Sequence, residues 1–120
     1  MWPFNLFGKQ PKLRITRIDG RFSTSAQIKP DQIETLAQAG YTAILCARPD
    51  KEQQGQPPFA DIAREAKKHG IKAIHIPISG MPNANQAAIC RKALAEVDGP
   101  VIGYCRSGAR ATSLYRAATR

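Results

Sequence analysis

Short apolar runs alternate with amphipathic segments along most of this chain, and that alternation limits its fold more than any other feature. Continuous apolar runs of this kind are typical of strands that are buried on both faces of a sheet. The clearest runs are YTAILC, IKAIHIPI and GPVIGY, at residues 41–46, 71–78 and 99–104. Strands that alternate with helices predict an α/β domain with a mostly parallel sheet flanked by helices.

The segments between these runs carry helix signals. Pro30 suits a first helical turn, and Gly40 and Gly70 stand where a helix would end. Four segments place their apolar side chains on one helical face, at residues 29–40, 59–70, 86–97 and 111–120.

The chain has 120 residues, which suits a single domain, and no repeat or linker divides it. We expect this domain to span residues 13–120 and to begin with an edge hairpin whose strands lie at 13–18 and 20–26. No apolar run reaches the roughly 20 residues of a membrane span, and the apolar start is too short for a signal peptide. Residues 1–12 are expected to form a tail whose apolar side chains pack on the domain or on a partner, or remain from a longer chain: Trp2, Phe4, Leu6 and Phe7.

The composition indicates the cellular compartment and the kind of molecule that the protein binds. Three cysteines, an odd number without a signal peptide, predict free thiols in the reducing cytoplasm. Cysteine and histidine are not spaced as metal ligands, so we expect no metal and no cofactor. The net charge of +9 favours an anionic partner. Because the basic residues are scattered and aromatic residues are few, we expect a small anionic substrate rather than a specific nucleic acid.

The stretch YCRSGARA, residues 104–111, joins the last apolar run to the last helical segment. A glycine inside the turn lets the backbone bend, so that its amides and the following helix N-terminus form an anion nest. Such a nest favours Cys105 as a thiolate, and Arg110 can offer two parallel hydrogen bonds to an oxyanion. We therefore predict Cys105 and Arg110 as catalytic residues. The remaining turn residues are predicted to bind substrate: Arg106, Ser107, Gly108 and Ala109.

Two other loops, at residues 46–50 and 77–85, are expected beside this turn, because the carboxyl ends of parallel strands meet at one edge of a sheet. Arg48 and Asp50, in the stretch ARPDKE, are candidates for substrate binding, with an Arg48–Asp50 ion pair that braces the loop as the alternative. Cys46 is expected to be a buried strand residue, the alternative being a resolving thiol for Cys105. For the turn itself, the alternative is a buried structural cysteine beside a solvated arginine.

The turn CRSGAR resembles the active loop of rhodanese sulfurtransferases, which carry Cys-x4-Arg. Roughly residues 13–118 resemble the phosphatase-like domain family of beta-lactamase-hydrolase-like proteins, through QI-x-P, AGY, RPD and YCRSG-x-R. This resemblance implies a protein-tyrosine-phosphatase-like fold, Cys105 as the covalent nucleophile, and a setting beside sulfide-oxidation enzymes.

The resemblance implies two chemistries. Tyrosine phosphatases carry His-Cys-x5-Arg, but here Tyr104 replaces the histidine and Ala111 stands in place of the arginine, so the loop is one residue shorter. They also need a general acid, and the stretch SGMPNANQ has no carboxylate, which leaves Asp50 or Glu52. We therefore expect a rhodanese-like sulfurtransferase that takes sulfur from thiosulfate or a persulfide onto Cys105. The alternative is an atypical phosphatase that forms a phosphocysteine from a phosphoester, and a third interpretation is a non-catalytic anion-binding module.

Overall fold

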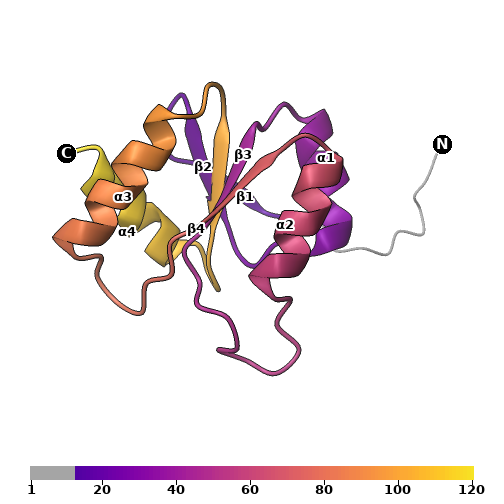
Figure 1. Ribbon diagram of the computed structural model, residues 1–120, viewed down its shortest axis with the longest axis horizontal. Helices are drawn as coiled ribbons and strands as arrows, with labels where there is room; N and C mark the ends of the chain where they lie inside the picture. The colour runs from indigo at the N-terminus through magenta and orange to yellow at the C-terminus, as the bar shows by residue number, and fades with distance from the viewer. Residues whose placement is uncertain (1–12) are drawn as a thin grey trace.

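A five-stranded sheet forms the centre of the computed structural model, which describes residues 13–120 (Figure 1). The predicted tail, residues 1–12, lies outside the described residues. Strand order is β1-β2-β5-β3-β4, with β1 antiparallel at the edge and the other four strands parallel. The strands are β1 (Ile15–Arg17), β2 (Phe22–Ser25), β3 (Ala43–Cys46), β4 (Lys72–His75) and β5 (Val101–Tyr104).

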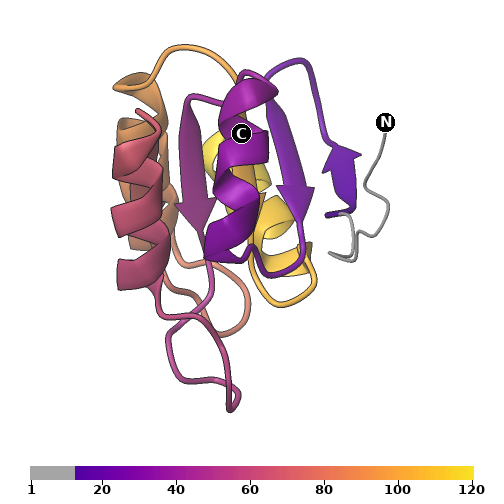
Figure 2. The ribbon, with the colours of Figure 1, turned by 90° about the vertical axis from the view of Figure 1, so that its right-hand side faces the viewer.

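Helices cover both faces of this sheet. One face carries α1 and α2, and the other carries α3 and α4 (Figures 1 and 2). Within the described part of the chain, no helix is long and apolar enough to cross a membrane. The predicted fold, a single α/β domain with a mostly parallel sheet flanked by helices, is confirmed. The helices are η1 (Pro30–Gln32, a 3-10 turn), α1 (Ile33–Gln38), α2 (Phe59–Lys68), α3 (Ala84–Ala95) and α4 (Ala109–Ala118).

The core has two apolar clusters because the central strands bury side chains on both faces. Along β3, Leu45 packs with the cluster that includes residues of α3 and α4, whereas Ile44 packs with the cluster of α1 and α2. Both side chains are fully buried. This alternation explains why the sequence shows continuous apolar runs: neither face of a central strand meets solvent.

Two helix starts differ from the sequence prediction. Helix α3 begins at Ala84 because the Asn83 side chain accepts a hydrogen bond from the Gln86 N–H at 2.8 Å, while the Gln86 side chain accepts one from the Asn83 N–H. This capping box starts the helix earlier than the predicted residue 86. Helix α4 begins at Ala109, directly after Gly108, so the turn after β5 is shorter than predicted and Arg110 lies in the first helical turn.

The strand order places the last turn at the centre of the sheet edge. The chain passes from β2 through β3 to β4 and then returns, so that β5 pairs between β2 and β3. Cys105 follows β5 directly. Its turn therefore lies between the carboxyl ends of two neighbouring strands, where open α/β sheets bind ligands.

Candidate active site

The Cys105 thiol lies at the base of the turn after β5 and is fully buried. The backbone N–H of Gly108 donates a hydrogen bond to its Sγ at 3.0 Å. Burial opposes ionisation of this thiol, but hydrogen bonds from the turn and from the start of α4 outweigh it, and the pKa of Cys105 is lowered. The N–H groups responsible are those of Ala111, Ser107, Gly108 and Arg110.

Gly108 makes this nest possible. It is the residue before α4 and has a φ of 102°, a left-handed conformation that L side chains rarely adopt. A Cβ at this position would also lie 3.3 Å from the Ser25 carbonyl oxygen. The Ser107 hydroxyl accepts a hydrogen bond from the Ala109 N–H at 3.3 Å, so Ser107 caps the helix start. The amides of the turn thus point towards the Cys105 Sγ, while Arg106, Ser107 and Ala109 are exposed.

The Arg110 guanidinium holds a carboxylate of the same chain. Its Nη1 donates to Glu52 Oε2 at 2.7 Å and its Nη2 donates to Glu52 Oε1 at 2.9 Å. Nη1 also donates to the Ile78 carbonyl oxygen at 3.0 Å. Hydrogen bonds to Glu52 raise the pKa of Arg110, and Cys105 adds to this effect. The two N–H groups predicted for an oxyanion are therefore present as a pair, and they are engaged by Glu52.

These contacts bring together the three loops that were predicted to border one site. Glu52 comes from the loop after β3, Ile78 from the segment after β4, and Arg110 from the start of α4. All three segments lie at the lower end of the sheet in Figure 1. Among residues 13–120, no group of three or more His, Cys, Asp and Glu side chains is arranged to hold a metal ion.

Arg48 lies deeper than a substrate-binding residue was expected to lie. It is 2% exposed, and its Nε donates to Glu52 Oε1 at 2.9 Å. Its other nitrogens donate to the side-chain oxygens of Gln27 at 2.8 Å and Gln53 at 3.3 Å. Arg48 therefore reaches the Cys105 turn through Glu52, which also contacts Arg110.

The Arg48–Asp50 ion pair suggested by the sequence is wrong. Asp50 Oδ1 accepts a hydrogen bond from the Phe59 N–H at 2.9 Å, at the start of α2. Asp50 is therefore occupied as a helix cap, since α2 needs an acceptor at its first turn. Arg48 forms its ion pair with Glu52 instead, four residues further along the chain.

From the sequence, Glu52 was considered only as a substitute acid. In the structure it contacts both Arg48 and Arg110. The hydrogen bonds of Arg110, and then those of Arg48, lower the pKa of Glu52 to about 2. Its spacing of four residues from Arg48 was the local signal for the inner contact. No local signal pointed to Arg110, which is 58 residues away in sequence.

Two residues near Cys105, Cys46 and Tyr104, lie in the core. Cys46 packs with Tyr104 in the cluster of α1 and α2, whereas Cys105 belongs to the cluster of α3 and α4. Burial raises the pKa of both Cys46 and Tyr104. Tyr104 thus fills the core rather than facing the thiolate, although it occupies the place of the phosphatase histidine. Arg106 and Ala109 are exposed at the rim of the turn.

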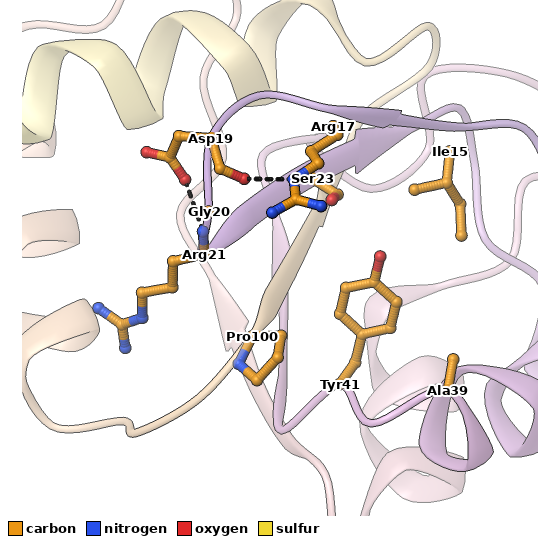
Figure 3. A pocket seen from close by; sticks show the side chains of 9 residues that line it. All are labelled: Ile15, Arg17, Asp19, Gly20, Arg21, Ser23, Ala39, Tyr41 and Pro100. Carbon is orange, nitrogen blue, oxygen red and sulfur yellow. Dashed lines mark hydrogen bonds between the residues drawn. The ribbon is translucent and has the colours of Figure 1, made fainter.

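A separate pocket of about 310 Å³ lies at the opposite end of the sheet (Figure 3). It is lined by Arg17, Ser23 and Tyr41, among others, near the amino ends of β2, β3 and β5. It contains none of the residues of the Cys105 turn. The candidate active site is therefore the closed turn around Cys105, and this pocket is not part of it.

The strand order and the helices on both faces place this chain among α/β domains with a protein-tyrosine-phosphatase-like fold. Residues 13–119 match the family described as the phosphatase-like domain of beta-lactamase hydrolase-like proteins, and the chain belongs to this family. The resemblance stated from the sequence is confirmed.

Relatives agree with this assignment. The beta-lactamase hydrolase-like protein of Agrobacterium fabrum is 33% identical over 105 residues, which are 86% of this chain and 24% of that protein. The chain thus spans about a quarter of the length of this curated relative. A "putative phosphatase" of Neisseria meningitidis is 30% identical with a TM-score of 0.76, covering 84% of this chain and 72% of that one.

A more distant structure shows the fold alone. The kinase associated phosphatase is 14% identical with a TM-score of 0.68, and the match covers 92% of this chain and 77% of that one. Neither the family description nor these proteins support the expected sulfurtransferase, the rhodanese-like assignment or the sulfide-oxidation partner. They favour the alternative, a phosphatase-like domain.

Proposed function

We propose that this domain is a cysteine-based phosphatase that hydrolyses phosphomonoesters, small ones or phosphotyrosine, through a phosphocysteine on Cys105. The observation that carries the proposal is the Cys105 thiol, whose pKa is lowered by the amides that converge on its Sγ. A thiolate in an anion nest is a nucleophile already placed beneath the site of a phosphate group. The family description and the Neisseria relative both support phosphate chemistry.

The reaction follows from the position of these groups. Phosphate oxygens accept hydrogen bonds from the inward amides of the turn and from Arg110, which together neutralise the charge that grows during transfer. The Cys105 thiolate attacks phosphorus, and the bond to the leaving oxygen breaks. Water then attacks the phosphocysteine, so that inorganic phosphate leaves and the thiolate returns.

The short loop is compatible with this proposal. The Cys-x4-Arg spacing is one residue shorter than the Cys-x5-Arg of tyrosine phosphatases, and this difference favoured sulfur transfer over phosphate chemistry. Here α4 starts directly after Gly108, and two N–H groups of its first turn, those of Arg110 and Ala111, also favour the thiolate. Helix amides thus replace part of the longer loop, which supports a nest for a tetrahedral oxyanion.

Sulfur transfer to Cys105 is the second candidate, and one observation favours it. Residues 79–86 contain no aspartate or glutamate, and transfer of sulfur from thiosulfate needs no strong general acid. A non-catalytic anion-binding module is the third candidate. Both share the thiolate and the amide nest with the phosphatase, so they differ from it in measurable chemistry rather than in geometry.

The experiment compares the wild-type protein with Cys105→Ser on para-nitrophenyl phosphate, with acid-quenched samples analysed by intact mass. Hydrolysis that Cys105→Ser abolishes, with a phosphate adduct on Cys105, supports the phosphatase. A sulfur adduct after thiosulfate treatment that cyanide removes, without hydrolysis, would make the protein a sulfurtransferase. Phosphate binding without either adduct would leave the anion-binding module.

We further propose a small anionic phosphoester as the substrate and the reducing cytoplasm as the location. All three cysteines are free and buried, which suits a compartment that keeps thiols reduced. The exposed Arg106 adds positive potential at the rim of the turn, which favours anions.

A further inference from the structure

Phosphoester cleavage at Cys105 leaves one chemical need unmet: a proton for the leaving oxygen. Positioned acids contribute roughly 10²–10⁴-fold to such steps. The loop after β4 supplies no carboxylate over residues 79–86. Asp50 is held by the Phe59 N–H at 2.9 Å. The Glu52 carboxylate contacts Arg110, in the first turn of α4.

Glu52 and a phosphate compete for the same two N–H groups. Both oxygens of Glu52 are bound to Arg110, at 2.7 and 2.9 Å, in the two-bond arrangement that guanidinium also offers to phosphate. The Glu52 and Arg110 side chains are 28% and 21% exposed, so an incoming anion reaches the pair from solvent. A phosphate bound to Arg110 therefore replaces Glu52 there.

We propose that bound phosphate releases Glu52 from Arg110 and that Glu52 then donates the proton to the leaving oxygen. This inference rests on the proposed phosphatase function and assigns its general acid. Glu52 keeps its contact with Arg48, which holds the carboxylate beside the phosphate it has made room for.

The release also lets Glu52 take up a proton from solvent. Paired with Arg110 and Arg48, Glu52 has a pKa of about 2 and carries no proton near neutral pH. Loss of the Arg110 contact and the arrival of a phosphate dianion both raise the pKa of Glu52, while Arg48 alone continues to lower it. The same exchange therefore binds the substrate and prepares the acid.

The backbone that carries Glu52 is held without help from Arg110. Lys51, directly before Glu52, is the one non-glycine residue among residues 13–120 with a positive φ, 65°. The Glu52 N–H donates to the Gln56 side chain at 3.0 Å, and Gln56 in turn donates to the Pro49 carbonyl at 2.9 Å. These bonds hold the backbone at Glu52 whether or not its side chain contacts Arg110.

The proton count closes over the two steps. In the first, the S–P bond forms, the bond from phosphorus to the leaving oxygen breaks, and the proton of Glu52 passes to that oxygen. In the second, the Glu52 carboxylate accepts a proton from the attacking water, the new P–O bond forms and the S–P bond breaks. The products are the alcohol, inorganic phosphate and the Cys105 thiolate. When phosphate leaves, Glu52 returns to Arg110 and gives back to solvent the proton that it took up on its release.

Glu52→Gln tests this role, with leaving groups of different basicity as the readout. We expect kcat/KM for phenyl phosphate, whose leaving group needs a proton, to fall by about 10²-fold or more. The loss on para-nitrophenyl phosphate, whose leaving group is stable as an anion, should be at least about tenfold smaller. Equal losses on both substrates would overturn the proposal and leave Glu52 as a residue that only positions Arg110. Glu96→Gln, which removes a carboxylate paired with Lys72 at 3.7 Å at the other end of the sheet, is the matched control.

A measurement on the wild-type protein avoids any folding defect of the variant. Below the pKa of a working acid, kcat/KM should depend weakly on leaving-group basicity, and above it steeply. A steep dependence at every pH would contradict the role of Glu52, while hydrolysis that requires Cys105 would still support the phosphatase. Absence of Cys105-dependent hydrolysis would remove the proposed function itself, and the role of Glu52 with it.

Discussion

Arg48 and Arg110 meet on a single oxygen atom, Oε1 of Glu52, each at 2.9 Å. Arg48 is a buried residue of the loop after β3, and Arg110 lies in the first turn of α4. One carboxylate therefore joins the core side of the site to its anion-binding side. The charges at the site act as a unit, so a change at any of the three residues alters the other two.

The Glu52 network should make stability fall in acid. Glu52 has its pKa lowered from 4.5 to about 2 by Arg110 and Arg48. A carboxylate whose pKa is lowered by folding stabilises the protein above its ordinary pKa, and this contribution is lost as pH falls through 4.5 towards 2. We expect urea midpoints to decline over this range, and Glu52→Gln to decline less steeply. Identical slopes for the two proteins would show that Glu52 contributes nothing to folding stability.

Cys105 should be the reactive thiol of the chain. Its pKa is lowered, whereas burial raises the pKa of Cys90 to about 11 and also raises that of Cys46. Alkylation by iodoacetamide, followed by mass spectrometry against pH, should modify Cys105 first, with a midpoint at lower pH than that of an ordinary thiol. Phosphate should slow this reaction by occupying the nest. Equal modification of Cys105→Ser and the wild-type protein would contradict the assignment.

The fold could be predicted from the sequence because its signals are local. Apolar runs mark strands buried on both faces, and Gly40 and Gly70 mark helix ends. The Cys105 turn was visible for the same reason, since nucleophile, glycine and arginine are neighbours in sequence. The start of α3 was misplaced because the Asn83–Gln86 capping box was not recognised.

The contacts that were predicted wrongly or not at all join residues that are distant in sequence. The sequence suggested Asp50 as an ion-pair partner for Arg48. Its side chain instead accepts a hydrogen bond from the N–H of Phe59, nine residues away, and so caps α2. Glu52 finds Arg110 only because β5 returns to the centre of the sheet beside β3. Charge spacing along the chain carries no information about that return, so the central contact of the site could not be inferred before the structure.

Gly108→Ala should damage both the fold and the nest. The substitution places a Cβ at a φ of 102° and 3.3 Å from the Ser25 carbonyl oxygen. The left-handed conformation alone costs roughly 1–2 kcal/mol, and the close contact adds to it. Gly40→Ala is the matched control, since it has a φ of 99° but nothing within 4 Å. Urea unfolding should show a larger loss for Gly108→Ala, and only this variant should raise the pKa of Cys105. A loss no larger than that of Gly40→Ala would show that the Ser25 contact relaxes freely.

Arg110→Lys separates the charge of Arg110 from its two-bond geometry. A lysine keeps the positive charge but donates from a single nitrogen, so it cannot hold two oxygens of a phosphate in parallel. If Cys105 transfers phosphate, loss of this arrangement should lower kcat/KM on para-nitrophenyl phosphate by about 10²–10³-fold, as loss of an oxyanion donor does. Arg116→Lys, at an exposed position in the last turn of the same helix, should leave kcat/KM unchanged. An active Arg110→Lys protein would mean that charge alone suffices and that the paired N–H groups of Arg110 serve Glu52 rather than the substrate.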